Sequence, residues 1–383
     1  MVDACDQRAV VTTAALRSAV AWSRRASEER AWREVARMTG VIMNARGPGD
    51  GPVTPAELVA SLRRPLGELL PPAGEPSALD AAILLDGDDE FTEAAMEIAC
   101  DYNHALFSGS DPATEWLPRW AWQRAEQVER QLFHSLIQSG SQAAYAASRR
   151  FVIERPAGNW RQLAEERNSS DAYQGARQVA DYVAIPPERI FQFARGDAGA
   201  CWWPCPVCRW PMRVQQQNVQ CTYSPHQARF RIGGRAVAGG SAPGLVKTSA
   251  ARLRTPQGRP VAGSRCVDPA VWRFITVPGI PELELERKLA GIAGIDVQLW
   301  PVKDTFDALV TAADGFQWTV DVKDHADAAR IANDPPAAAH VVVPGYRKGQ
   351  VNQLSRMLPG KRVWTIERFH RHVRDHELPS GAA

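Results

Sequence analysis

The sequence has few cysteines and no long apolar run. Seven cysteines in 383 residues are too few for a disulfide framework in a chain of this length, which favours a reducing compartment. No apolar run approaches the length of about 18 residues that a membrane span needs. Asp3 and Asp6 stand where a secretory signal peptide would be basic. We therefore expect a soluble, cytoplasmic protein.

One long segment lacks acidic residues altogether. Residues 198–267 contain ten Lys or Arg and no Asp or Glu, although the net charge of the whole chain is only +2. Such a segment can bind phosphates without sequence preference. A flexible basic linker is the alternative, because residues 233–244 are rich in Gly, Ala and Ser. The predicted nucleic-acid contacts in it are Arg229, Arg231, Arg235, Arg252 and Arg254.

Four cysteine and histidine side chains inside this basic segment have the spacing of a metal site. Cys205 and Cys208 form a Cys-x-x-Cys pair, Cys221 follows after twelve residues, and His226 comes next. Two such pairs complete a tetrahedral zinc site, and residues 212–220 have the length of the small hairpin in a zinc ribbon.

Other interpretations of these cysteines remain open. Cys201 or Cys266 could replace His226 as the fourth ligand. Alternatively, the cysteines could be reduced and packed among nearby tryptophans without any metal. A redox role is disfavoured, because the pair does not open a helix after a strand.

An acid and a lysine two residues apart stand on a predicted strand near the C-terminus. Residues alternate between the faces of a strand, so Asp321 and Lys323 would project together while Val322 turns toward the core. Glu286 and Lys288 have the same spacing, but they lie in a segment of helical periodicity, where residues two apart diverge. Of the two pairs, only the strand pair can share a site.

A tight turn brings a second carboxylate opposite Asp321. Two β-prone runs, 305–311 and 316–323, flank an Asp-Gly pair, which indicates a hairpin. A three-residue loop would centre the pairing on residue 314 and place Asp307 opposite Asp321, with Cβ atoms about 5 Å apart. A two-residue loop would shift the pairing by one residue and separate them.

The order of predicted elements resembles a known superfamily. From the N-terminal side, these elements are a helix at 282–292, a strand at 297–300, the hairpin, a helix around 328–331, a strand at 339–343, a short helix around 351–358, a strand at 362–366 and a basic stretch. This layout resembles the PD-(D/E)XK, or restriction-endonuclease-like, superfamily, which implies a mixed central sheet. Asp307 matches its first acidic position, Asp321 the second and Lys323 the lysine.

Short motifs resemble one branch of that superfamily more closely. The motifs are Pro278–Glu282 (PGIPE), Leu299–Leu309 (LWPVKDTFDAL) and Trp318–Asp324 (WTVDVKD). They are similar to the nuclease (REase) subunit encoded beside the prokaryotic PIWI-like pPIWI_RE protein and a DinG-type helicase. The resemblance implies a bacterial antiviral defence system acting on invading DNA, with those two proteins as partners. Composition and spacing by themselves do not indicate that role.

Phosphodiester hydrolysis gives each matched residue a role. Asp307 and Asp321 would hold Mg²⁺ (or Mn²⁺), with the Val322 carbonyl as a further ligand. Lys323 would orient or activate the attacking water and stabilise the developing negative charge.

Two further features flank the predicted site. Glu282, expected to open the helix ahead of the strands, would be another ligand or a water-orienting group, and Glu286 one turn later is its rival. A solvated role near the helix N-terminus is the alternative for both. Arg347 and Lys348 follow a buried strand and would contact the DNA backbone, unless they belong to an ordinary solvated loop.

We therefore predict a multidomain α + α/β protein. Residues 1–195 would form an α-helical domain for partner docking, in which Thr54–Glu57 starts a helix with a capping box. A basic zinc-ribbon-like module and linker would span 196–275. A restriction-endonuclease-like α/β nuclease domain with a mixed central sheet would span 276–374, before a tail at 375–383.

The leading prediction for function is Mg²⁺-dependent DNA cleavage. One alternative is a catalytically inactive nucleic-acid-binding adaptor that retains the nuclease fold, and another is a stand-alone restriction or repair nuclease. The sequence leaves open whether DNA or RNA is cut and in which strand form. A homodimer is one option, because cutting both strands of a duplex usually takes two active sites.

Overall fold

A computed structural model of the chain describes most of the sequence. The described residues are 4–26, 28–47, 49–72, 79–92, 94–95, 98–99, 141–176, 182–193, 199–233, 242–301, 305–326, 328–333 and 335–377. Arg235, one of the predicted nucleic-acid contacts, lies outside them. No helix among the described residues is both long and apolar enough to cross a membrane.

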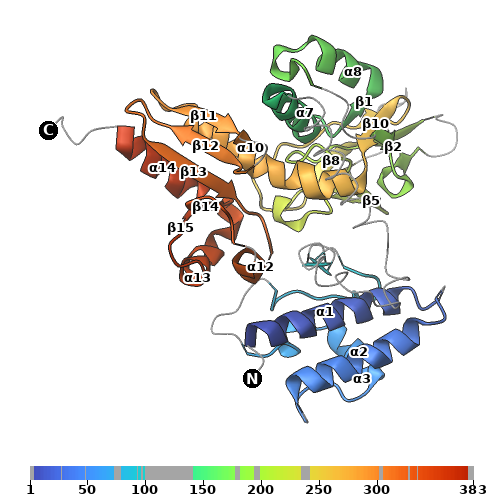
Figure 1. Ribbon diagram of the computed structural model, residues 1–383. Helices are drawn as coiled ribbons and strands as arrows, with labels where there is room; N and C mark the ends of the chain where they lie inside the picture. Colours follow the sequence, from blue (N-terminus) through green and yellow to red (C-terminus); the bar gives the residue numbers. More distant parts are fainter. Residues whose placement is uncertain are drawn as a thin grey trace. The chain divides into compact units, whose positions relative to one another are not determined.

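The chain forms two compact units, each with its own hydrophobic core. The first unit contains residues 1–120, 325–335 and 349–359. The second contains residues 121–324, 336–348 and 360–383. In Figure 1 the N-terminal helices of the first unit are blue, and the elements of the second run from green to red.

Helices make up the first unit. Its described elements are α1 (Ala4–Ser23), α2 (Ala31–Arg46), α3 (Pro55–Leu62), the 3₁₀ turn η1 (Leu66–Glu68), α12 (Ala328–Asn333) and α13 (Val351–Met357). α1, α2 and α3 pack on one another around Leu16, Ile42 and Leu58 (Figure 1). The buried Glu34 is neutralised by Arg17, whose Nε donates to Glu34 Oε1 at 2.8 Å.

The predicted start of α3 is confirmed. The Thr54 side chain accepts a hydrogen bond from the Glu57 N–H at 3.2 Å, and Pro55 occupies the first helical position. The Glu57 carboxylate reaches back to the Val53 N–H at 2.8 Å, one residue before the position expected of a capping box.

The second unit begins with small antiparallel sheets. The elements of this part are α7 (Gln142–Glu154), β1 (Ala157–Asn159), α8 (Trp160–Ser169), η3 (Asp171–Tyr173), β2 (Tyr182–Ala184), η4 (Pro187–Arg189), β3 (Phe191–Gln192), β4 (Ala200–Trp202), β9 (Arg259–Pro260) and β10 (Ser264–Val267). One sheet has the order β1-β10-β2 and another β3-β4-β9. β10 pairs with β1 and β2, which precede residue 195, so the regions on both sides of residue 195 fold together.

A four-stranded antiparallel sheet carries the cysteine-rich part of the basic segment. Its elements are β5 (Arg213–Gln215), β6 (Asn218–Gln220), the 3₁₀ turn η5 (Ser224–His226), β7 (Arg229–Gly233) and β8 (Gly244–Lys247). β5 and β6 form the small hairpin predicted between the cysteine pairs.

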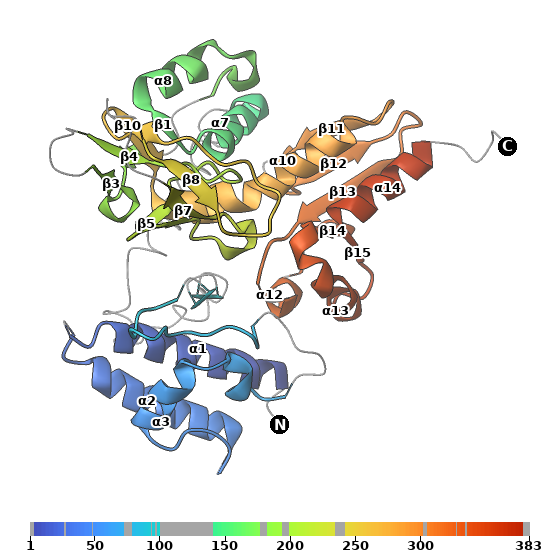
Figure 2. The same cartoon turned by 180° about the vertical axis from the view of Figure 1, so that it is seen from behind.

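A five-stranded mixed sheet forms the C-terminal part, as the sequence predicts. Its strands are β11 (Asp296–Leu299), β12 (Ala308–Thr311), β13 (Gln317–Val322), β14 (His340–Val343) and β15 (Arg362–Thr365). β11, β12 and β13 run antiparallel, and β13, β14 and β15 run parallel, in the spatial order of the chain. Figure 2 shows the sheet from behind.

Two helices cover one face of this sheet. They are α10 (Val277–Leu289) and α14 (Ile366–Glu377), which contact each other and the strands. The ring of Trp318 on β13 lies edge-on against His376 of α14, with centroids 4.9 Å apart. Because side chains alternate along a strand, Val322 faces these helices with Trp318. Asp321 and Lys323 therefore face the opposite side.

The helix before the sheet starts earlier than predicted. Helical structure passes through α9 (Pro269–Val271), the π-helical turn η6 (Trp272–Thr276) and α10. α10 ends at Leu289, and Glu282 lies in its second turn. The expectation that Glu282 opens the helix is therefore wrong. The π-helical turn interrupts the regular hydrogen-bond ladder just before Pro278, so the missing proline N–H does not end the helix there.

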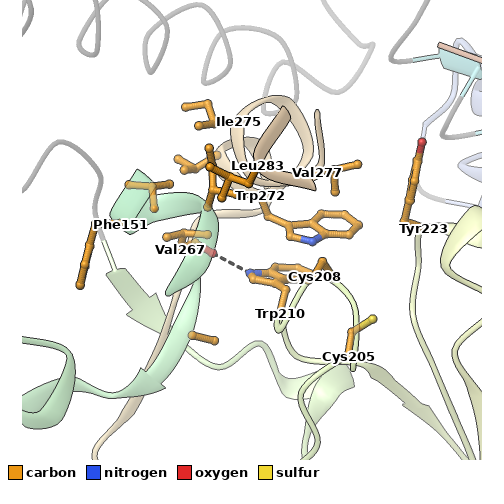
Figure 3. Close-up of a cluster of buried hydrophobic side chains, with 14 of the residues drawn as sticks. Phe151, Cys205, Cys208, Trp210, Tyr223, Val267, Trp272, Ile275, Val277 and Leu283 are labelled. Carbon is orange, nitrogen blue, oxygen red and sulfur yellow. Dashed lines mark hydrogen bonds between the residues drawn. The ribbon is translucent and has the colours of Figure 1, made fainter. Parts of the chain in front are cut away.

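One hydrophobic core extends through the second unit. Trp210 stacks on Trp272, with ring centroids 4.5 Å apart and 13° between the planes, and its Nε1 donates to the Val267 carbonyl at 3.0 Å (Figure 3). This stack joins the Cys-x-x-Cys loop to the helix that leads into α10. The core of the second unit contains residues from both sides of the predicted domain boundaries at 195 and 275. The two compact units therefore have other bounds than the three predicted domains.

Candidate functional site

The β12–β13 hairpin has the register that places Asp307 beside Asp321. Ala308 pairs with Val320 and Thr311 with Gln317, so the pairing centres on residue 314. The Ala312 N–H donates to the Phe316 carbonyl at 2.9 Å, which closes a three-residue loop. The predicted register is confirmed, and the two-residue loop is excluded.

Both aspartates are held by backbone N–H groups. The Val322 N–H donates to Asp307 Oδ2 at 2.7 Å, and the Ala338 N–H donates to Asp321 Oδ2 at 3.1 Å. Each carboxylate is thereby fixed on the strand end where β12, β13 and β14 meet. Hydrogen bonds from fixed N–H groups hold the carboxylate oxygens in one orientation.

Lys323 lies between the two aspartates. Its Nζ is 3.9 Å from Asp307 Oδ2 and 3.8 Å from Asp321 Oδ1. The lysine side chain is 28% exposed, whereas the Asp307 side chain is 14% and the Asp321 side chain 7% exposed. The Lys323 N–H donates to the Val342 carbonyl at 2.8 Å, which keeps the residue in the β13–β14 ladder. The three side chains form a polar site that opens toward solvent through the lysine.

Glu282 belongs to a different cluster. Its carboxylate accepts hydrogen bonds from Arg149 Nη2 at 3.0 and 3.1 Å and from Trp300 Nε1 at 2.6 Å. Its rival Glu286 pairs with Arg150. Glu282 and Glu286 of α10 are thus each paired with an arginine of α7. One path from Glu282 to the aspartates runs through Trp300, whose backbone N–H donates to the Asp307 carbonyl at 2.9 Å.

The predicted zinc ligands converge on one point. Cys205, Cys208, Cys221 and His226 are all buried, and their donor atoms lie within 4.8 Å of one another. Among the described residues this is the one group of at least three such side chains close enough to share a metal ion. His226 lies in this group with the three cysteines, whereas Cys201 and Cys266 do not.

The spacing of the donor atoms fits a tetrahedral zinc ion. Cys208 Sγ is 3.8 Å from Cys221 Sγ, and His226 Nδ1 is 3.3 Å from Cys221 Sγ and 3.7 Å from Cys205 Sγ. With Zn–S near 2.3 Å and Zn–N near 2.0 Å, the edges of such a tetrahedron measure about 3.5 to 3.8 Å. The cluster therefore has the donor set and dimensions of a structural zinc site.

Local backbone geometry folds both ligand loops around the site. The Val207 N–H donates to Cys205 Sγ and the Tyr223 N–H to Cys221 Sγ, both at 3.4 Å. Each loop ends on a left-handed residue, Arg209 with φ 59° and Gln227 with φ 50°. Backbone N–H groups aimed at sulfur stabilise thiolates, which are the metal-binding form.

The pKa values of these thiols shift in opposite directions. Burial raises the pKa of Cys205 and of Cys221 well above the ordinary value. For Cys208, burial also acts to raise the pKa, but hydrogen bonds with the Cys205 and Cys221 thiols and the charge of His226 hold it well below that value. Three thiolates in such a site need a cation to compensate their charge.

The outer face of the β5–β8 sheet is basic. Arg213 on β5 pairs with Gln220, which pairs in turn with Arg229 on β7. Directly paired residues share a face, and Arg231 lies two residues further along β7. The three arginines are exposed, whereas Phe230 between two of them is buried. They therefore project together from one side of the sheet.

The other predicted nucleic-acid contacts divide between surface and interior. Arg252, Arg254 and Lys348 are exposed. Arg347 is buried, and its Nε donates to Asp324 Oδ1 at 3.0 Å. The expectation that Arg347 reaches the DNA backbone is contradicted, because a guanidinium that neutralises a buried carboxylate is held inside the protein.

Sequence reasoning missed Asp324 and the two tyrosines that bind it. The Asp324 side chain is 1% exposed and accepts hydrogen bonds from Tyr223 at 2.6 Å and Tyr346 at 2.5 Å. Burial, and then the nearby Asp324 charge, raise the pKa of Tyr346, so its phenol stays protonated and donates. The sequence holds no local signal for this cluster, because the three residues are far apart along the chain.

Two protein-family models match the chain. Residues 8–159 match the family described as pPIWI_RE three-gene island domain Y, and residues 279–378 match the family described as REase associating with pPIWI_RE. No curated protein and no solved structure gives a significant match. The second match contains the β12–β13 hairpin with both aspartates and Lys323. The second match confirms the resemblance to the pPIWI_RE-associated REase predicted from the motifs, over residues 279–378, and the first adds a second pPIWI_RE domain over residues 8–159.

Proposed function

We propose that the chain is a Mg²⁺-dependent DNA endonuclease and the nuclease component of a pPIWI_RE defence system. The observation that carries the proposal is the site on β13, where Asp307 and Asp321 lie side by side with Lys323 less than 4 Å from both. The family match over residues 279–378 supports the same reaction class. A PIWI-like protein and a helicase are the proposed partners.

The aspartates fit a hard divalent cation. They offer carboxylate oxygens from one strand end, which suit Mg²⁺ or Mn²⁺ better than the softer metals. The Val322 N–H points toward Asp307, and the N–H and C=O of one strand residue point to the same edge. The Val322 carbonyl is therefore the third proposed ligand. When bound, the cation would neutralise charge on the phosphoryl oxygens and lower the pKa of a bound water.

The protein side chains then have separate tasks. Asp307 and Asp321 hold their charge in fixed positions, so little reorganisation is needed when the phosphate arrives. Lys323 donates hydrogen bonds to the attacking water and to the phosphoryl oxygens as negative charge develops there. Glu282 acts as a positioning residue, because it fixes Trp300, whose N–H holds the Asp307 carbonyl.

The zinc site and the basic sheet face support substrate binding. We propose a structural zinc at the Cys/His cluster and DNA phosphate contacts from Arg213, Arg229 and Arg231. Arginines projecting from one sheet face can follow the regular spacing of phosphates along a strand. The domain Y segment, residues 8–159, is the proposed docking part for the partner proteins.

Cleavage of plasmid and single-stranded DNA with Mg²⁺ or Mn²⁺ tests the proposal. Asp321→Ala and Lys323→Ala should each lower the rate by roughly 100-fold or more, because each removes a charge that stabilises the transition state. Asp296→Ala is the matched control, since Asp296 is an exposed aspartate on the same sheet. Each protein is assayed by itself and together with any partner that co-purifies with it.

The outcomes separate the alternatives. Cutting that depends on the metal and is lost in both variants, but not in Asp296→Ala, supports the nuclease. No cutting under any condition favours the nucleic-acid-binding adaptor that keeps the fold. Cutting that neither substitution changes indicates a contaminating enzyme or another active site.

A further inference from the structure

A buried carboxylate lies directly after the proposed catalytic lysine. Asp324 follows Lys323 in the chain, and its side chain is 1% exposed. It accepts hydrogen bonds from the hydroxyls of Tyr223 at 2.6 Å and Tyr346 at 2.5 Å and from Arg347 Nε at 3.0 Å. Charge-assisted bonds of this kind, out of water, hold their partners in one arrangement.

One of these partners comes from the Cys/His cluster. Tyr223 lies two residues after Cys221, and its N–H donates to Cys221 Sγ at 3.4 Å. Its ring stands edge-on to His226, with ring centroids 4.8 Å apart and 72° between the planes. The tyrosine thus touches two of the four metal donors with its backbone and ring, and Asp324 with its hydroxyl.

The same network joins the ends of two strands of the nuclease sheet. Arg347 Nη2 donates to the Tyr223 hydroxyl at 3.1 Å, so tyrosine, arginine and aspartate form a closed set of bonds. Arg347 follows β14, and Asp324 follows β13, which pairs with β14 through Val322 and Val342. The position of Lys323 between these elements depends on both ends.

A buried aspartate needs hydrogen-bond donors in any protein, so burial alone does not indicate a functional role. The informative feature is where one donor originates. Tyr223 is 101 residues from Asp324 in sequence and sits between two metal ligands. A change in the geometry of the Cys/His cluster therefore reaches the residue next to Lys323 through a single side chain.

We propose that Tyr223 and Asp324 couple the two metal sites of this protein, so that zinc bound at the Cys/His cluster positions Lys323 and Asp321 for the divalent cation. Tyr223 and Asp324 are positioning residues, which act through Lys323 and its strand without touching substrate. The inference rests on the proposed function, because it assumes a cation at Asp307 and Asp321. Coupling between two binding sites is reciprocal, so the divalent cation should also tighten zinc binding.

The first experiment measures Mn²⁺ affinity in the zinc-loaded full chain by electron paramagnetic resonance of free Mn²⁺. Tyr223→Phe removes the hydroxyl and keeps the ring beside His226, so it should retain one equivalent of zinc. Its Mn²⁺ affinity should fall by at least roughly 5-fold, because coupling between sites usually amounts to about 5- to 150-fold. Activity is not needed for this readout.

Tyr173→Phe is the matched control. Tyr173 is also buried, and its hydroxyl donates to the Glu154 carboxylate at 2.7 Å in the same unit. Loss of that bond removes a similar tyrosine–carboxylate contact away from β13. The Mn²⁺ affinity of this variant should remain within about twofold of the wild-type value, since no coupling path is removed.

A second experiment needs no variant near the cysteines. Zinc affinity of the wild-type chain is measured against a chromophoric chelator with and without saturating Mn²⁺. Mn²⁺ should strengthen zinc binding by the same factor that zinc strengthens Mn²⁺ binding. The effect should vanish in Asp321→Asn, which removes a proposed Mn²⁺ ligand and leaves the Cys/His cluster intact.

Two results overturn the inference alone. They are unchanged Mn²⁺ affinity in Tyr223→Phe, or equal losses in Tyr223→Phe and Tyr173→Phe. In the second experiment, a zinc affinity that Mn²⁺ does not change likewise overturns the inference. The proposed function itself fails if the wild-type chain does not bind Mn²⁺, or if the Asp321→Asn variant binds Mn²⁺ as well as the wild type does. Neither of these results depends on the Tyr223 variant.

Discussion

The Cys/His cluster and the aspartate pair differ in how complete they are. The cluster brings four buried donor atoms within 4.8 Å of one another. The aspartate pair offers carboxylates on one strand end beside a lysine that is 28% exposed. A closed set of four protein ligands is typical of structural zinc, whereas catalytic sites leave positions for water and substrate. This difference supports the proposed structural role of the first site and the proposed chemistry of the second.

The second unit connects the two sites through its interior. Trp210 on the cysteine loop stacks on Trp272, and Tyr223 binds Asp324 at the end of β13. The fold thus joins a closed cluster of buried side chains to a site that is partly open to solvent. An open site needs such support, because its own ligands do not enclose it.

Removing the cysteine pair is expected to have the largest effect. Cys205→Ser with Cys208→Ser should abolish stoichiometric zinc and unfold the loops around it, because structural zinc contributes on the order of 10 kcal/mol in small metal-bound domains. Elemental analysis and thermal unfolding measure both consequences. Cys201→Ser is the control, since Cys201 is buried nearby but outside the cluster. A zinc-free variant that unfolds like the wild type would break the comparison.

Substitution of Glu282 tests whether its carboxylate serves the buried ion pair with Arg149 or the site formed by Asp307 and Asp321. Glu282→Gln should cost about 3 kcal/mol of unfolding free energy, because it leaves the Arg149 charge buried without its partner. Denaturant unfolding gives the loss, and Mn²⁺ binding should hardly change, because the glutamine oxygen can still accept the bond from Trp300 Nε1. Glu286→Gln, at a more exposed pair with Arg150, should cost less than about 1 kcal/mol. Full stability with lost Mn²⁺ binding would instead make Glu282 a ligand.

The basic sheet face should give the smallest effect. Arg213→Ala with Arg229→Ala should lower the slope of log K against log salt for DNA by about two, one for each phosphate contact. Fluorescence anisotropy at several salt concentrations measures it. Arg161→Ala with Arg287→Ala removes the same charge from other exposed positions of the unit. Equal slopes in the two double variants would show that only net charge matters.

Much of the nuclease sheet could be predicted because its signals are local. The strands of the sheet are short apolar runs, and the Asp-Gly turn fixes the register that joins Asp307 to Asp321. The helix before the sheet was misplaced, because a π-helical turn carries it through prolines that usually end a helix. The C-terminal basic stretch was not placed in the fold, although Ile366, Phe369 and Val373 recur at helical spacing and are buried in α14.

The sequence by itself indicated the Cys/His cluster and the hairpin that pairs the two aspartates, and it left the fourth member of the cluster and the length of the turn open. These follow from spacing, alternation and turn chemistry, which act over short stretches of chain. Only the tertiary structure decided that Arg347 is buried against Asp324, that Arg149 neutralises Glu282, and that Tyr223 joins the Cys/His cluster to Asp324. Such contacts join residues far apart in sequence, and the desolvation that makes them strong exists only after the chain has folded.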